Sequence, residues 1–182
     1  MAFNKLTAGT KGNPNNSTGP QIATAVNQLV DAASQIWIPA TQFTYANGEA
    51  STGYVGGRFP AWTMKHTTDD QINAMFVPVD GWQSYDISLY WTNVGVNTGD
   101  VRLSVSVGTV ADGGNVQSTD TDYNLTVTAP AQRILKVTDI TSSNSLAASG
   151  LGYVAIQRVG TNVDDTLNNE IAVIGVMLTR KV

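Results

Sequence analysis

The apolar residues near the start of the chain have the spacing of an amphipathic helix. They recur at steps of four, three, four and three, which places them in one narrow row. Thr18 can cap this helix, with Gln21 as its capping-box partner. Because the row is too narrow for a globular core and too short for a stable lone helix, we predict that it aligns copies of the chain. The seam would consist of Ile22, Val26, Leu29, Ala33 and Ile36. The alternative is that the row packs onto the chain's own β-domain.

After Pro39 the pattern changes to a period of two, which is typical of half-buried β-strands. The clearest strands are 85–91 and 101–107, and the short loop between them predicts a hairpin. The last segment, 170–179, is apolar on both faces and indicates a strand that lies centrally or at an interface. Further strands are expected at 42–45, 59–65, 72–79, 123–128, 133–140 and 153–159, with loops at 47–57, 111–122, 141–150 and 160–169.

This pattern predicts a mainly β protein, because short strands follow one another with no alternating helices. An antiparallel two-sheet sandwich, jelly-roll-like, fits roughly eight or nine such strands. The short oligomerising helix precedes it. We therefore divide the chain into residues 1–38, an anchoring tail with the helix, and residues 39–182, the β-sandwich domain.

The composition restricts the partners of this fold. Charged residues make up 13% of the chain and the net charge is −4, without a Lys/Arg block, which argues against a nucleic-acid partner. The absence of cysteine excludes disulfides and thiol chemistry. We find no secretory leader and no apolar run of transmembrane length, so no membrane partner is expected.

The titratable residues form no recognisable catalytic pattern. His66 is the single histidine, so one chain cannot build a histidine-rich metal site, and we expect an exposed loop residue. The acidic pairs Asp69-Asp70 and Asp164-Asp165 match neither the facing carboxylates of a glycosidase nor an EF-hand. We interpret them as solvated loop carboxylates that cap turns, with a calcium site as the alternative. The prediction is a non-enzymatic protein without cofactor or metal.

The tryptophans raise the alternative of a glycan-binding surface, because aromatic faces stack on apolar ligand surfaces. Strand alternation buries Trp91, and Trp62 lies among apolar residues. Trp82 follows a turn, and Tyr90 points away from Trp91, so these two are the candidate glycan contacts. The competing interpretation is packing in the core or between subunits.

Residues 1–17 are rich in Asn, Gly and Thr and contain one short apolar group, Phe3 and Leu6. This segment is either a disordered tail or an anchoring peptide that becomes ordered when these two side chains dock on a larger assembly.

From Ile36 onwards the chain resembles small β-sandwich proteins of tailed-bacteriophage particles, namely head decoration proteins, head fibres and short tail-fibre modules. The segments that carry the resemblance are "IWIPATQF", "FVPVDGWQSYDISLYWT" and "GYVAIQRVGTNVDDTLNNEIAVIGVMLTRKV". It implies a virion location, a structural or accessory role and a homotrimer that contacts phage capsid or tail proteins. It carries over no catalytic residue. The second hypothesis is a glycan-binding module that attaches the particle to its host.

Overall fold

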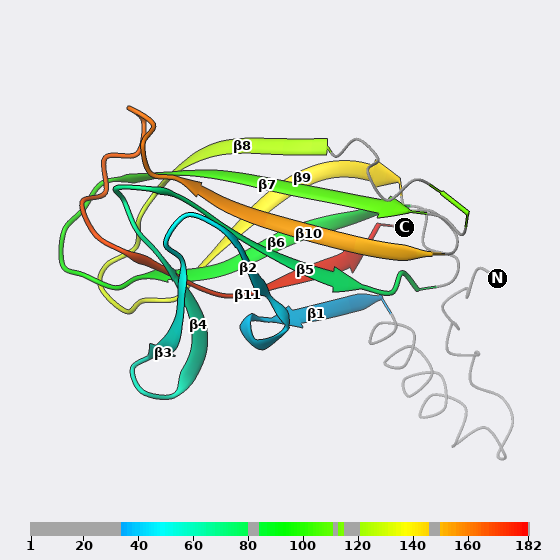
Figure 1. Cartoon of the computed structure of the whole chain (residues 1–182), viewed down its shortest axis with the longest axis horizontal. Helices are drawn as coiled ribbons and strands as arrows, with labels where there is room; N and C mark the ends of the chain where they lie inside the picture. Colours follow the sequence, from blue (N-terminus) through cyan, green and yellow to red (C-terminus); the bar gives the residue numbers. More distant parts are fainter. Residues whose placement is uncertain (1–33, 80–83, 111–112, 115–120, 146–149, 182) are drawn as a thin grey trace, which may run out of the picture.

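The computed structural model describes residues 34–79, 84–110, 113–114, 121–145 and 150–181. These residues confirm the predicted two-sheet antiparallel sandwich (Figure 1). A single 3-10 turn, η2 (Ala40–Gln42), follows the first strand. The strands are β1 (Gln35–Pro39), β2 (Thr44–Asn47), β3 (Ser51–Val55), β4 (Phe59–Met64), β5 (Asp69–Phe76), β6 (Ser84–Asn93), β7 (Asp100–Val110), β8 (Thr121–Thr128), β9 (Lys136–Ser145), β10 (Leu151–Val159) and β11 (Ile171–Arg180).

The two sheets have the orders β3-β4-β11-β6-β9 and β2-β5-β10-β7-β8. Strand β1 completes the first, six-stranded sheet by pairing with β11. One side of β11 pairs with β6 along its length, while β4 and β1 share the other side, at Ile171–Val173 and Gly175–Thr179 respectively. This central position explains why the last strand is apolar on both faces.

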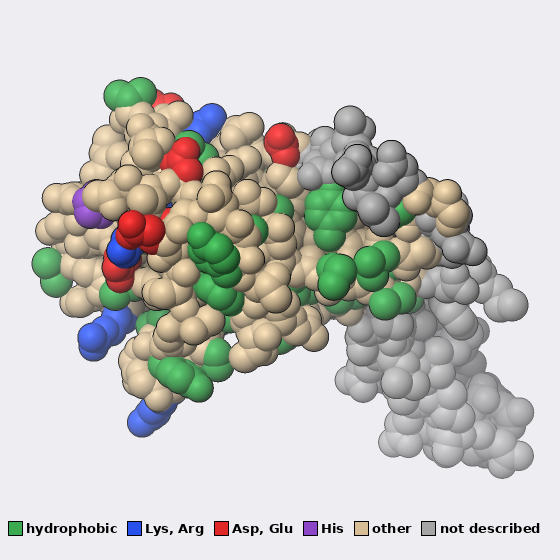
Figure 2. Space-filling model, viewed as in Figure 1, with side chains coloured by type: hydrophobic (Ala, Val, Ile, Leu, Met, Phe, Trp, Pro, Cys, Tyr) green, Lys and Arg blue, Asp and Glu red, His purple; other side chains and the backbone are tan. Residues whose placement is uncertain are grey.

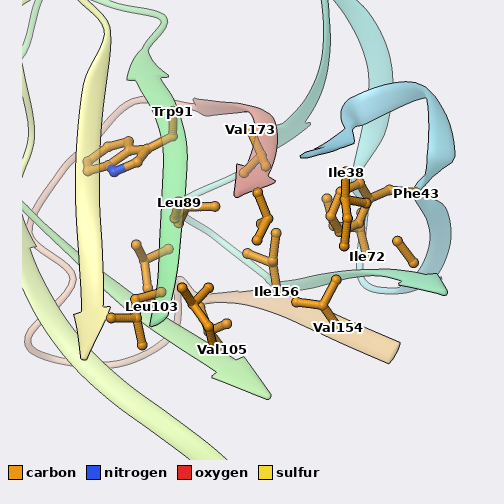
Figure 3. Packing of buried hydrophobic residues seen from close by; sticks show 14 of the residues in the cluster. Ile38, Phe43, Ile72, Leu89, Trp91, Leu103, Val105, Val154, Ile156 and Val173 are labelled. Carbon is orange, nitrogen blue, oxygen red and sulfur yellow. The ribbon is translucent and has the colours of Figure 1, made fainter. Parts of the chain in front are cut away.

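The core lies between the sheets and is formed by alternate residues of the strands (Figure 3). Leu89 and Trp91 of β6 and Leu103 of β7 are fully buried. The indole nitrogen of Trp91 donates a hydrogen bond to Thr138 Oγ1 at 2.9 Å, so the buried polar atom is paired. The predicted burial of Trp91 and Trp62 is confirmed.

The predicted hairpin between β6 and β7 is wrong. Strand β6 pairs with β11 and β9, whereas β7 pairs with β10 and β8 in the opposite sheet. The connection crosses between sheets, and alternation cannot distinguish this arrangement because both strands bury one face in either case. The predicted loop 47–57 contains β3, whose residues are mostly exposed, and the predicted loop 141–150 contains the end of β9.

The first strand of the described sandwich begins at Gln35, ahead of the predicted boundary at residue 39. Ile36 lies in β1 opposite Leu178 and packs partly buried against the core, so its place in a helical row is wrong. Ile36 and Ile38 also satisfy a period of two, and the strand uses that spacing. The remaining seam residues Ile22, Val26, Leu29 and Ala33, the anchoring residues Phe3 and Leu6, and Trp82 lie outside the described residues.

Candidate functional site

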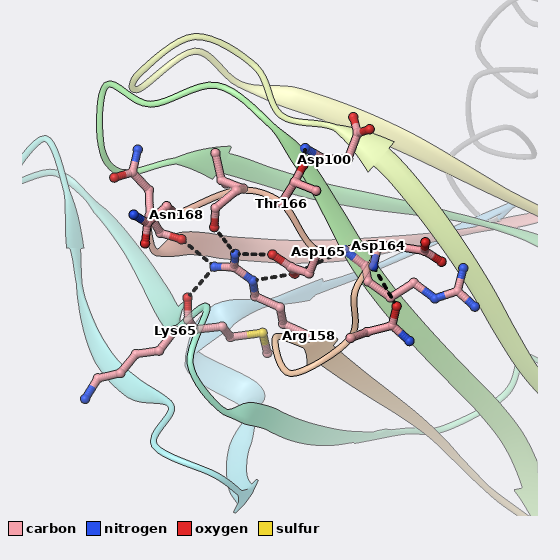
Figure 4. Close-up of polar contacts among 12 residues, drawn as sticks. Lys65, Asp100, Arg158, Asp164, Asp165, Thr166 and Asn168 are labelled. Carbon is pink, nitrogen blue, oxygen red and sulfur yellow. Dashed lines mark hydrogen bonds and ion pairs between the residues drawn. The ribbon is translucent and has the colours of Figure 1, made fainter.

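The largest buried polar group of the described residues is Arg158 on β10 (Figure 4). Its guanidinium donates to both carboxylate oxygens of Asp165, Nε to Oδ2 at 2.9 Å and Nη2 to Oδ1 at 2.7 Å. The remaining N–H groups reach backbone carbonyls of Met64, Leu167 and Asn169. Both side chains of the ion pair are fully buried. This network ties loop 160–170 to β10 and β4 and leaves the guanidinium no donor for a ligand.

Asp70 is a second fully buried carboxylate, and its partners are also internal. Its Oδ1 accepts from the Glu49 amide at 2.5 Å and from Thr68 Oγ1 at 2.7 Å, while Oδ2 accepts from the Lys65 amide at 2.6 Å. Asp70 and Asp165 are therefore not the solvated carboxylates that the sequence predicted. Each fixes two or more loop segments, a long-range role that short sequence spacing does not reveal.

His66 lines a polar hollow of about 320 Å³ together with Lys65, Asn169 and Glu170. The ammonium of Lys65 donates to Glu49, and this hydrogen bond, with the charge of Glu49, raises the pKa of Lys65. In the part of the chain that the structure describes, no three His, Cys, Asp or Glu side chains are grouped as metal ligands. The described part of the chain also contains no helix with the length and apolar character needed to span a membrane.

The outer face of the six-stranded sheet carries an apolar groove of about 440 Å³. Three aromatic side chains from three different strands surround it, Trp37 from β1, Phe59 from β4 and Tyr90 from β6. Trp37 and Phe59 are 40% and 60% exposed, and together with Tyr90 they gather exposed apolar surface in one place. The complete lining is Trp37, Val55, Phe59, Tyr90, Thr92, Arg133, Leu135, Ile174 and Met177.

Gly175 positions the indole of Trp37 on this face. A Cβ at Gly175 would lie 2.6 Å from Trp37 Cη2 and 2.7 Å from the carbonyl oxygen of Ile38, so only glycine allows the ring to lie against the strand. The ladder between β11 and β6 shifts register at Val173/Gly175, beside this contact. Trp37 and Tyr90 meet edge to face, with ring centroids 5.1 Å apart at 85°.

Three hydrogen-bond donors at the groove have no protein partner among the described residues. They are the indole N–H of Trp37, the hydroxyl of Tyr90 and the guanidinium of Arg133. Thr92 differs, because its hydroxyl donates to the carbonyl of Ile134 at 2.7 Å. The groove therefore combines aromatic faces with a few free donors, which is the usual construction of a small-molecule site.

Sequence reasoning found part of this groove. The predicted contact Tyr90 lies in it, whereas Trp37, Phe59 and Arg133 were missed. Trp37 lies between two inward-facing isoleucines, and this alternation could have shown that it points outward. The helical interpretation of the same segment concealed that signal.

No family model matches the chain, and no curated protein sequence is similar to it. The comparison of structures is informative about the fold, because the described sandwich is shared by parts of several large proteins.

The chain is similar to the mosquito-larvicidal Cry4Aa toxin from Bacillus thuringiensis, with a TM-score of 0.60 and 10% identity over 81% of this chain and 24% of the toxin. It is also similar to the isomalto-dextranase of Arthrobacter globiformis T6 complexed with panose (TM-score 0.54, 17% identity, 80% and 23% covered). A third is the Podospora anserina GH26-CBM35 β-(1,4)-mannanase (TM-score 0.51, 15% identity, 82% and 28% covered). The chain spans about a quarter of the length of each. At these identities the likeness shows the fold alone.

Proposed function

We propose that the sandwich is a non-enzymatic glycan-binding module whose site is the groove on the six-stranded sheet. The observation that carries the proposal is the aromatic surround of the groove, with free donors on Trp37 and Tyr90. A sugar ring offers an apolar face that stacks on aromatic rings and hydroxyls that accept hydrogen bonds from such donors. The volume of about 440 Å³ falls in the range of small-molecule sites.

Two further observations support this proposal. Two of the proteins with a similar fold are named for action on glycans, which agrees with the proposal at the level of the fold. The non-enzymatic part of the proposal rests on the lining of the groove, because no Asp or Glu is among the described residues that form it. General acid–base catalysis on a glycosidic bond needs two carboxyl groups that face a bound sugar.

Trp37→Ala tests the site directly. The variant should bind more weakly on an array of polysaccharides, with affinity about fivefold lower or more, since stacking on an aromatic ring contributes on the order of 1 kcal/mol. Circular dichroism should show an unchanged fold. Tyr45→Ala is the matched control, because Tyr45 is an exposed aromatic residue on the other sheet. Equal binding by wild type and Trp37→Ala would rule out this groove as the glycan site.

We propose, as a second function, that the chain is an accessory protein of a bacteriophage virion, assembled as a homotrimer. The resemblance of residues 36–182 to small phage sandwich proteins supports this setting, and so does the weakly charged surface (Figure 2). The segment that precedes β1 carries the apolar row and would contact capsid or tail proteins through Phe3 and Leu6. Electron microscopy of the bacteriophage particles labelled with an antibody against this chain tests the proposed virion location. Particles that bind no antibody would contradict it.

A further inference from the structure

The backbone of Arg133 is held in a conformation that non-glycine residues seldom adopt. Its φ is 60°, and among the described residues no other non-glycine residue has a positive φ. Hydrogen bonds on both sides enforce this geometry. The Arg133 amide donates to the carbonyl of Asn93 at 2.8 Å, and Thr92 Oγ1 donates to the carbonyl of Ile134 at 2.7 Å. Such strain persists only where the surroundings over-determine it, and it is frequent at ligand sites.

The residues that enforce the strain are themselves rigid. Thr92 and Asn93 are buried at the end of β6, and the side-chain amide of Asn93 also donates to the carbonyls of Asn97 and Pro130. The strained backbone therefore places the Arg133 side chain at the groove from a fixed base. If the side chain at position 133 had no role at the groove, glycine would adopt the same positive φ at a lower energetic cost.

Arg133 is the charged residue among those that line the groove. Its guanidinium has no ion pair among the described residues, although Arg158, Lys65 and Lys181 each have a carboxylate partner. Glu170 lines an adjoining hollow with Arg133 but forms no ion pair with it. The groove thus presents an unneutralised planar cation beside aromatic faces. Guanidinium binds carboxylates through two parallel hydrogen bonds, more strongly than it binds neutral acceptors.

We propose that the groove selects acidic glycans, with a uronic-acid carboxylate on Arg133 and the apolar face of a sugar ring against Trp37 and Tyr90. This inference rests on the proposed glycan-binding function and names its ligand class. The carboxylate would supply the ion-pair partner that Arg133 does not have among the described residues.

The test uses the full chain and pairs of polysaccharides, in which each uronic-acid polymer is printed beside its carboxyl-reduced, neutral form. Wild type should bind the acidic member at least about tenfold more tightly, and 0.5 M salt should weaken only that binding. Arg133→Ala should bind both members equally. Arg133→Gly should give the same result while folding at least as stably, because glycine accepts the positive φ.

Arg58→Ala is the matched control, since Arg58 is an exposed arginine in the β3–β4 turn that does not line the groove. It should keep the preference for the acidic member. If wild type binds both members of each pair equally, the acidic class is wrong and the glycan site stands. If wild type binds no member of any pair, both this inference and the proposed function are overturned.

Discussion

At the scale of single residues, Arg158 and Asp165 carry a large energetic consequence. Both side chains are fully buried, and every guanidinium N–H of Arg158 faces an acceptor. A buried ion pair is not a strong stabiliser against an apolar replacement, but removal of one member leaves an uncompensated charge in the interior.

Asp165→Ala should therefore lower the free energy of unfolding by about 3–5 kcal/mol, measured by urea denaturation. Asp164→Ala is the control, since Asp164 is exposed and its carboxylate has no hydrogen-bond partner among the described residues. It should change the free energy by no more than about 0.5 kcal/mol. Similar losses for the two variants would show that the buried pair is not a determinant of stability.

Residue roles could be predicted from the sequence only where local alternation decides them. The burial of Trp91 follows from its strand, and the outward direction of Tyr90 follows from the same pattern. The role of Asp165 depends on a carbonyl of β4 and an arginine of β10, and the strain of Arg133 depends on the end of β6. Contacts between segments that are distant in the chain leave no local pattern to read.

At the scale of elements, the contact between β1 and β11 positions the groove. Trp37 lies over Gly175, and any side chain at that position would meet both the indole and the backbone of β1. The two strands are held together along Gln35–Pro39.

Gly175→Ala should displace the indole or separate the strands. We expect a loss of about 1–3 kcal/mol in stability, as for other overpacked sites, together with a shift in tryptophan fluorescence. Gly53→Ala is the matched control, because a Cβ at Gly53 would have only Thr63 Oγ1 within reach, at 3.8 Å. An unaltered emission spectrum in Gly175→Ala would show that the glycine does not position Trp37.

Strands with strict alternation were predicted correctly, as 85–91 and 101–107 show by their correspondence to β6 and β7. Strand β3 was missed because an edge strand with exposed residues needs no apolar face, and its only described neighbour is β4. The pairing partners of β6 and β7 could not be predicted from the sequence for a different reason. Alternation specifies which face of a strand is buried, but it does not specify which strands pair with its two edges.

At the scale of the whole molecule, the exposed apolar side chains of the groove, among them Trp37 and Phe59, lie on the outer face of the six-stranded sheet. Trp37 belongs to β1, the strand that directly follows the N-terminal segment. The sequence predicts that this preceding segment holds copies of the chain together. An oligomer of this kind would carry one groove on each copy of the chain. Simultaneous binding at several grooves would then raise the overall affinity for a polymeric ligand above that of a single groove.

Leu29→Asp tests this arrangement, because a carboxylate in the seam opposes burial of the apolar row. The wild type should have the mass of a trimer by light scattering, and the variant should have a lower mass with an unchanged β circular dichroism signal. Thr24→Asp, off the row, is the control and should keep the trimer mass. A wild type that sediments as a single subunit would contradict the trimer.

The first described strand also sets the mechanical path through the molecule. Trp37 is the third of the five residues of β1, the strand that follows the N-terminal segment, and Gln35 of the same strand pairs with Thr179. A force on a ligand that rests on Trp37 would reach an N-terminal attachment through a few backbone bonds, without passing through the interior. Tension between such a ligand and that attachment would thus be carried by the covalent backbone of β1, and the rest of the sandwich would stay unloaded.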